Sequence, residues 1–263
     1  GDINIIRTLN HINKWTLKPD EIIVCLPPGK KINIKGIKIK FKLLFSTKKG
    51  QTQQRILGIK KARNNIILQM DDDVKLNKNC LEKMYAELST LGKKNLVGGV
   101  FYDRNIKNYF YRYKLKYIYQ VFRDIYDKFI CCAPPGIEKM GKLTKIGVAY
   151  GVDPRYVDKK ITHFRCDWLN SFLLGYKSDV KVQRIYPYDG KAYGEDVINS
   201  IFRKRKKINH YICPKARFET FKIDSSRNFL SKFIEYYKLS RSKYYILKLL
   251  KGNKLHFCIY LLF

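Results

Sequence analysis

Two short acidic stretches, far apart in the chain, contain the residues best suited to chemistry. The first, Asp71-Asp72-Asp73, directly follows the apolar run Ile66–Met70. Three adjacent carboxylates at the end of a buried strand repel one another unless a cation lies among them. Open α/β sheets bind ligands at the carboxyl ends of their strands, and carboxylate oxygens suit Mg²⁺ or Mn²⁺. The stretch therefore predicts either a divalent-cation site or a solvated acidic turn.

The second stretch, Glu195-Asp196, follows Gly194 and precedes apolar residues at helical spacing. It thus lies in the first turn of a predicted helix, where the helix dipole stabilises negative charge. An aspartate with an ordinary pKa of about 3.9 is ionised at neutral pH and can accept a proton. Taken alone, the pair is also compatible with a plain helix cap. The presence of both stretches favours a catalytic site.

The elements around these stretches must bring them together. Hydrophobic periodicity predicts helices over 2–12 and 51–63 and from 194 onward, and strands over 21–26, 37–43, 66–70 and 96–102. This order predicts an α/β sheet with at least some parallel strands. A parallel unit normally opens with a strand, so we also expect a further strand of about ten residues before Gly1. The segment 104–163 has no readable pattern.

The composition sets limits on the class of protein. With 263 residues, of which 45% are hydrophobic, the chain can bury a core, which excludes disorder as its main state. Its formal net charge of +32 suggests nucleic acid, an anionic membrane or phosphorylated ligands as partners. The basic residues are spread along the whole chain, however, and Lys, Ile, Asn and Tyr are over-used together, as in proteins of AT-rich genomes. Charge alone therefore does not decide the function.

The seven cysteines include no C-x-x-C pair, which predicts reduced thiols in a cytosolic protein. No run of about 18 uninterrupted apolar residues occurs, so we expect no transmembrane helix. From Arg203 to Phe263 there are 16 basic and 3 acidic residues, with aromatic side chains between them. We divide the chain into a domain over 1–224 and a basic, aromatic, helical appendage over 225–263. Such an appendage can bind anionic lipid, which predicts a cytoplasmic protein peripheral to the inner face of the cell membrane.

The residues before the first acidic stretch form a pattern. In order, they are Gln54-Arg55, Gly58-Ile59, Ala62, the strand Ile66–Met70 and Asp71-Asp72-Asp73. This order resembles the Q-R-x-x-G-I-x-x-A…D-x-D segment of family 2 glycosyltransferases with the GT-A fold. Later, Asp167-Trp168-Leu169 and Tyr193–Val197 resemble the acceptor-side D-W-L and G-E-D stretches of that family. The resemblance extends from Asp20 to Arg227.

The resemblance implies a Rossmann-like, mixed and mostly parallel sheet flanked by helices. It also implies an inverting, metal-assisted transfer of a sugar from a nucleotide-sugar, a UDP- or dTDP-sugar, to a hydroxyl of a saccharide or lipid-linked acceptor. The process implied is cell-surface polysaccharide assembly. By analogy, the roles are Asp196 as catalytic base; Asp73 and Asp71 as ligands of Mn²⁺ or Mg²⁺; Arg55, Asp71 and Asp72 in donor binding; and Trp168 and Glu195 in acceptor binding.

The chain also departs from the family's pattern. The family's acidic turn after its second strand is replaced by Cys25–Gly29, which leaves the nucleobase open. The family's histidine after P-x-A is absent, and Glu219 could serve as an oxygen ligand instead. The Q-x-x-R-W signature of processive synthases is missing, which favours single transfers.

Two other interpretations stay open. A non-catalytic basic protein that binds nucleic acid explains the charge but not the two acidic stretches, because carboxylates repel a phosphate backbone. We therefore expect no nucleic-acid partner. A degenerate transferase that keeps the fold without activity is suggested by the altered turn at Cys25–Gly29. Hydrolysis of a donor in the presence of Mn²⁺ discriminates among the three.

Overall fold

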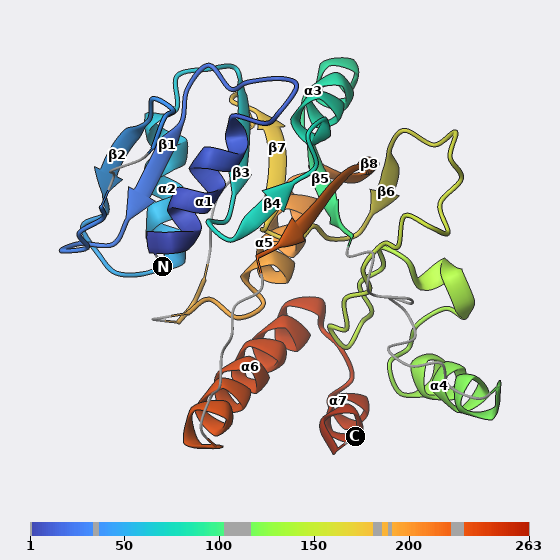
Figure 1. Cartoon of the computed structure of the whole chain (residues 1–263). Coiled ribbons are helices and arrows are strands. Elements are labelled where there is room, and N and C mark those ends of the chain that lie inside the picture. The colour runs from blue at the N-terminus through green and yellow to red at the C-terminus, as the bar shows by residue number, and fades with distance from the viewer. Residues whose placement is uncertain are drawn as a thin grey trace.

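A mixed sheet forms the centre of the protein (Figure 1). The computed structural model describes residues 2–33, 37–102, 117–180, 186–188, 191–221 and 229–262. The sheet has the strand order β3-β7-β5-β8-β4, and β6 also pairs with β8. These strands are β3 (Ile66–Met70), β4 (Val74–Leu76), β5 (Asn95–Phe101), β6 (Phe164–Cys166), β7 (Leu173–Lys177) and β8 (Asn209–Thr220). The expected α/β sheet is confirmed.

The sheet is mixed and contains a parallel pair, as the sequence predicted, but its described pairs are less parallel than the family resemblance implied. The pair β5–β8 is parallel, and β3–β7, β5–β7, β4–β8 and β6–β8 are antiparallel. The reason is that β7 runs between β3 and β5 in the opposite direction. No strand was predicted over the residues of β7.

A separate parallel pair is formed by β1 (Ile23–Leu26) and β2 (Lys42–Phe45). The strand predicted over 37–43 was therefore placed too early. In the observed register, residues 37–41 would have to pair with residues 18–22, and Pro19 has no N–H to donate to such a ladder. Ile37, Ile39 and Phe41 still pack against the core. The alternation of apolar residues and lysines over 37–43 thus reflects burial of the apolar side chains and not pairing of a strand.

Helices cover the sheet and carry its core. Helix α1 (Asp2–Ile12) buries Ile5, Leu9 and Ile12, and α3 (Cys80–Thr90) buries Cys80 and Met84 in the same cluster. Helix α2 (Gln51–Lys61) packs against β1. The helices predicted over 2–12 and 51–63 are confirmed. Helix α1 buries one apolar face, as an amphipathic helix does, whereas α2 has no fully buried residue and its Ile59 packs partly buried against the core.

The remaining helices of the described residues follow β5 in the chain. They are α4 (Tyr117–Phe129), a short 3-10 helix (Gly136–Lys139), α5 (Glu195–Arg205), α6 (Phe229–Leu250) and α7 (Lys254–Leu262). Helix α6 packs on α5, because Ile246 lies in one cluster with Val197, Ile198 and Ile201. The helices α6 and α7 lie within the segment where a helical appendage was expected.

The seven cysteines are free, as expected for reduced thiols. Cys80, Cys131 and Cys213 are buried, and Cys132 and Cys258 are exposed. Within the part of the chain that the structure describes, no helix has both the length and the apolar composition needed to cross a bilayer.

Candidate active site

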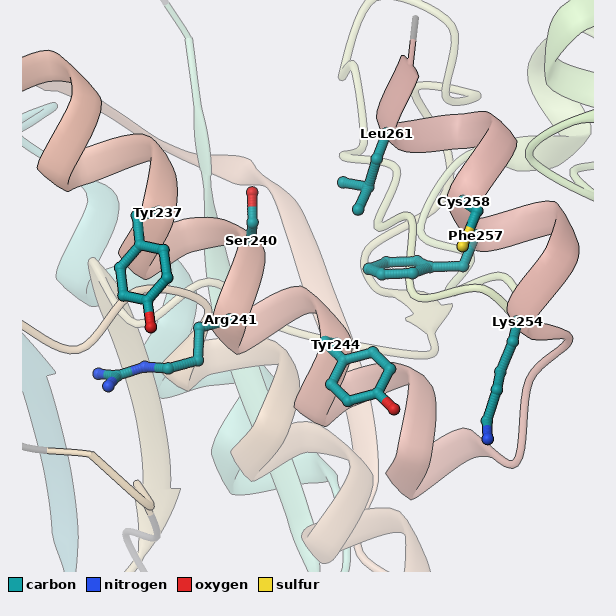
Figure 2. Close-up of a pocket in the computed structure, with 8 residues that line it drawn as sticks. All are labelled: Tyr237, Ser240, Arg241, Tyr244, Lys254, Phe257, Cys258 and Leu261. Carbon is teal, nitrogen blue, oxygen red and sulfur yellow. The ribbon is translucent and has the colours of Figure 1, made fainter.

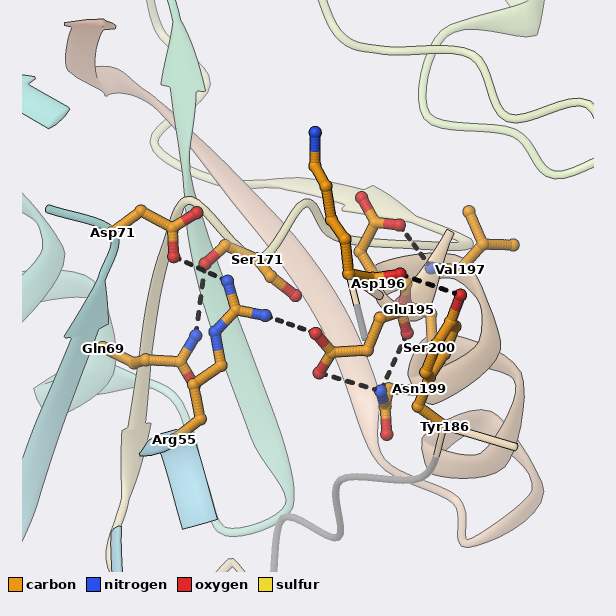
Figure 3. Close-up of polar contacts among 11 residues, drawn as sticks. Arg55, Gln69, Asp71, Ser171, Tyr186, Glu195, Asp196, Val197, Asn199 and Ser200 are labelled. Carbon is orange, nitrogen blue, oxygen red and sulfur yellow. Dashed lines mark hydrogen bonds and ion pairs between the residues drawn. The ribbon is translucent and has the colours of Figure 1, made fainter. Parts of the chain in front are cut away.

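Arg55, on α2, joins the two acidic stretches (Figure 3). Its Nη2 donates to Oδ1 of Asp71 at 2.6 Å, and its Nη1 donates to Oε2 of Glu195. The side chains of Arg55 and Glu195 are only 8% and 2% exposed. One guanidinium therefore holds the end of β3 and the beginning of α5 at the same place, although their residues are far apart in the sequence.

The end of β3 is fixed by its neighbour β7. The backbone N–H of Asp71 donates to the carbonyl of Phe172 at 3.0 Å, and Nε2 of Gln69 donates to the carbonyl of Ser171 at 3.1 Å. Beside it, Nε2 of Gln54 donates to the carbonyl of Cys25 at 2.7 Å, which ties α2 to β1. The Gln54-Arg55 pair thus links β1, β3 and α5 through two adjacent side chains.

The beginning of α5 depends on Gly194. This residue has φ +67°, in the left-handed region, where a side chain is strained. A Cβ atom there would also lie 3.2 Å from Cδ1 of Ile246 on α6. Asn199, one turn later, donates through Nδ2 to Oε1 of Glu195 at 3.2 Å. Sequence reasoning missed Asn199, although its i,i+4 spacing from Glu195 could have revealed it.

Asp196 lies in the first turn of α5 and is partly buried. Its Oδ1 accepts a hydrogen bond from the backbone N–H of Val197 at 2.9 Å. Burial raises the pKa of Asp196 to about 6, and the neighbouring carboxylate of Glu195 also acts to raise it. A carboxylate with this pKa is ionised at pH 7 and holds a proton more tightly than an ordinary aspartate, which suits a general base.

The turn Asp71-Asp72-Asp73 is anchored through its backbone. Thr8 donates through Oγ1 to the carbonyl of Asp72 at 2.7 Å, and the N–H of Phe221 donates to the carbonyl of Asp73 at 2.8 Å. The side chain of Asp72 is exposed and that of Asp73 is half-buried. Burial raises the pKa of Asp73, and the carboxylates of Asp71 and Asp72 raise it further. A bound cation would offset this repulsion.

The donor set at this turn fits Mg²⁺ or Mn²⁺. No group of three or more His, Cys, Asp or Glu side chains that could hold a metal occurs among the described residues. Proteins commonly bind Mg²⁺ through one or two carboxylates plus substrate phosphates, which is what Asp71 and Asp73 offer. Glu219, a further oxygen ligand considered from the sequence, lies 3.6 Å from Nζ of Lys75.

Trp168 is partly buried and packs against the cluster of Val197, Ile198 and Ile201 on α5. Its indole N–H donates to the carbonyl of Tyr150 at 2.9 Å. Asp167, the first residue of the D-W-L stretch, accepts from Nζ of Lys204 at 2.6 Å. This stretch therefore supports α5 along its length.

A comparison of the sequence with models of known protein families identifies the family of this chain. The sequence model of the glycosyl transferase family 2 matches residues 4–145, which is more than half of the chain. The chain belongs to glycosyltransferase family 2. The match includes Arg55 and the turn Asp71-Asp72-Asp73, and it ends before α5. No curated protein sequence matches this family 2 chain.

Solved structures similar to this family 2 chain include two glycosyltransferases. GalNAc-T7, solved with UDP, GalNAc and Mn²⁺, is 13% identical with a TM-score of 0.58, over 85% of this chain and 42% of that one. The mannosyltransferase PcManGT from Pyrobaculum calidifontis, solved with GDP-Man and Mn²⁺, is 12% identical with a TM-score of 0.51, over 95% of this chain and 70% of that one. The chain thus spans less than half of GalNAc-T7. These similarities confirm the GT-A fold.

Proposed function

We propose that this family 2 chain is an inverting glycosyltransferase that moves a sugar from a nucleotide-sugar donor to an acceptor hydroxyl. The single observation that carries the proposal is the contact of Arg55 with both Asp71 and Glu195. Asp71 is itself a candidate metal ligand, and Glu195 directly precedes the candidate base Asp196. Both kinds of group are needed at one place for the transfer.

On the donor side, Asp71 and Asp73 would hold Mn²⁺ or Mg²⁺ together with the donor diphosphate. When bound, the metal acts as a Lewis acid that offsets the charge of the departing nucleoside diphosphate. We assign the exposed carboxylate of Asp72 to donor binding. Arg55 is buried between two carboxylates, so we assign it to the positioning of Asp71 and not to the diphosphate itself.

On the acceptor side, Asp196 would remove the proton of the attacking hydroxyl. Inversion requires the base to act on the face of the sugar opposite the leaving group, and a positioned base contributes about 10²- to 10⁴-fold in rate. Glu195 is held by Arg55 and Asn199. We therefore assign it to positioning α5, and we keep the partly buried Trp168 as the proposed acceptor contact.

The substrates follow the sequence-based expectation. The donor would be a UDP- or dTDP-sugar, and the UDP and GDP-Man bound in the two similar structures support a nucleotide-sugar as the donor class. The acceptor would be a saccharide or a lipid-linked saccharide in cell-surface polysaccharide assembly, and the enzyme would work in the cytoplasm at the inner face of the cell membrane. Binding of Mn²⁺ in both similar structures supports a divalent cofactor.

A thermal-unfolding panel tests this proposal. UDP, dTDP, GDP and ADP are each added with Mn²⁺ or with EDTA, because a ligand that binds only the folded state raises apparent stability. We expect one nucleoside diphosphate to raise the Tm only when Mn²⁺ is present. A chain that no nucleotide stabilises, or that only single-stranded DNA stabilises, would refute the proposed function.

A further inference from the structure

Helix α4 exposes an apolar stripe. Val121, Ile125 and Phe129 are four residues apart and therefore lie on one face of the helix, next to Phe122, and all four side chains are exposed. Phe122 is 63% exposed and Phe129 is 61% exposed. Exposed apolar residues grouped in this way mark an interaction site, whereas scattered ones are ordinary.

The buried side of α4 fixes the orientation of this stripe. Asp127 is buried and accepts hydrogen bonds from Nζ of Lys139 at 2.6 Å and from the hydroxyl of Tyr150 at 2.8 Å. Both oxygens of the carboxylate are thus engaged by the body of the protein. Because Asp127 points inward, the stripe is held facing outward, and the exposed basic residues Arg123 and Lys128 flank it.

The first half of α6 carries a second exposed apolar stripe. Leu230, Phe233, Ile234 and Tyr237 follow the i, i+3, i+4, i+7 spacing of one helical face, and all are exposed. Residues 229–262, which include α6 and α7, contain seven basic residues and one acidic residue, Glu235. An apolar stripe with basic neighbours is the composition of helices that lie in a membrane interface.

Helices α4, α6 and α7 lie at the same end of the molecule (Figure 1) and are linked by one buried cluster. One buried cluster contains Cys131, which follows α4, together with Leu247 of α6 and Phe257 of α7, and Tyr126 of α4 packs against it. Between α6 and α7 lies a groove of about 500 Å³ (Figure 2). Its lining residues are Tyr237, Ser240, Arg241, Tyr244, Lys254, Phe257, Cys258 and Leu261.

We propose that the exposed stripes of α4 and α6, with the groove between α6 and α7, form a face that binds the surface of an anionic lipid bilayer. Apolar side chains of the stripes would enter the acyl boundary, a lipid chain would occupy the groove, and the basic residues would contact anionic headgroups. A second copy of the chain is a poorer occupant, because two bodies with a formal charge of +32 repel each other.

This inference rests on the proposed function in one respect, since it makes the acceptor a lipid-linked one. Helix α6 adjoins the beginning of α5, since a Cβ atom at Gly194 would lie 3.2 Å from Cδ1 of Ile246 and 4.0 Å from Cβ of Ser242. The α6 part of the proposed face therefore belongs to a helix that packs on α5, and α5 carries Asp196. An acceptor anchored in the bilayer would be presented beside the candidate base.

Co-sedimentation with lipid vesicles tests whether this face binds an anionic bilayer. The full chain is mixed with vesicles of equal parts phosphatidylglycerol and phosphatidylcholine, or with phosphatidylcholine alone. We expect binding to the anionic vesicles that is reduced but not abolished by high salt, since apolar insertion is not screened. Phe122→Ser with Phe129→Ser, and separately Phe233→Ser with Tyr237→Ser, should each weaken binding by at least about tenfold.

Matched controls and a second readout separate the possible failures. Phe45→Ser on β2 and Tyr85→Ser on α3 remove exposed aromatic rings elsewhere and should leave vesicle binding unchanged. Thermal unfolding and Mn²⁺-dependent nucleotide binding of the face variants should match the unaltered chain. The proposed membrane-binding face would be refuted if the chain does not bind anionic vesicles, or if the control variants lose as much binding as the face variants. It would also be refuted if sedimentation shows a dimer of the unaltered chain that the face variants no longer form. If the unaltered chain binds no nucleotide in the presence of Mn²⁺, the proposed function is refuted instead.

Discussion

Arg55 and Glu195 form a buried ion pair although 140 residues separate them in the sequence. The same guanidinium also binds Asp71. Its charge is therefore balanced by two carboxylates, one from each acidic stretch. A buried charge that loses its partner is costly, because water cannot replace the lost contact. The arrangement makes the folded state depend on the same contacts that bring the two halves of the candidate site together.

Substitution Arg55→Met should destabilise the fold. It leaves Asp71 and Glu195 without their common partner, and removal of one member of a buried ion pair costs about 3–5 kcal/mol. Urea unfolding measures the loss. The exposed Lys60 on the same helix provides the control, since Lys60→Met should change the free energy of unfolding by less than about 0.5 kcal/mol.

Adding Glu195→Gln to Arg55→Met should recover part of the lost stability, because it removes one unpaired charge. A double-mutant cycle then gives a coupling energy between Arg55 and Glu195. Independent, additive effects of the two substitutions would contradict the ion pair.

Substitution Asp196→Asn should lower turnover by about 10²- to 10⁴-fold while donor binding persists. Asparagine keeps the size of the side chain and its acceptor oxygen for the N–H of Val197, but it cannot take up a proton. Steady-state assays of transfer and equilibrium binding of the nucleotide are measured in parallel. Near-normal turnover would exclude Asp196 as the base.

The rate should also depend on the ionisation of Asp196. Since burial raises the pKa of Asp196 to about 6, the basic form prevails above that pH, and kcat/KM should fall as the pH drops through 6. An ordinary aspartate titrates at about pH 3.9. If kcat/KM does not change between pH 5 and 7, the pKa of Asp196 is not raised.

The same shift predicts that Asp196→Asn stabilises the fold at neutral pH. The folded state binds a proton more tightly than the unfolded state, so the unaltered chain loses stability as the pH rises from about 4 to 6. Asparagine does not titrate, so the variant keeps its stability over this pH range. At pH 7 its free energy of unfolding should exceed that of the unaltered chain by about 1–3 kcal/mol. Urea unfolding at pH 4 and pH 7 checks the sign, and the difference between the two proteins should vanish at the lower pH.

Substitution Asp73→Asn should abolish the Mn²⁺-dependent stabilisation by a nucleoside diphosphate. A ligand present at 100 times its Kd stabilises a protein by about 2.7 kcal/mol, which is readily seen as a shift in Tm. Asp20→Asn, an exposed carboxylate before β1, serves as the control and should keep the full shift. An unchanged shift in Asp73→Asn would remove this residue from the metal site.

The elements that carry the site were predictable from the sequence because their signals are local. The apolar run before Asp71 and the helical spacing after Gly194 are properties of adjacent residues, and β3 and α5 occur where these patterns indicated. The pairing of β7 between β3 and β5 was not predictable, since register depends on residues more than 70 positions apart. Helix α4 lies in the segment that had no readable pattern.

The contacts within the site were only partly predictable. The family resemblance led us to expect both acidic stretches and Arg55 at one site, and the structure brings Asp71, Arg55 and Glu195 together. The sequence contains no signal that Arg55 would bind Glu195, because no periodicity relates α2 to α5. The packing of α6 against Gly194 was equally hidden, since it depends on the absence of one Cβ atom next to Ile246.

The claim that the two acidic stretches form one site is tested most directly by a crystal structure of the chain with Mn²⁺ and UDP. Anomalous scattering locates the metal without reference to the protein's chemistry. We predict a manganese peak beside the carboxylates of Asp71 and Asp73 and the diphosphate, with Asp196 facing the same cavity. A manganese peak away from Asp73, or a nucleotide bound on a surface that Asp196 does not reach, would contradict it.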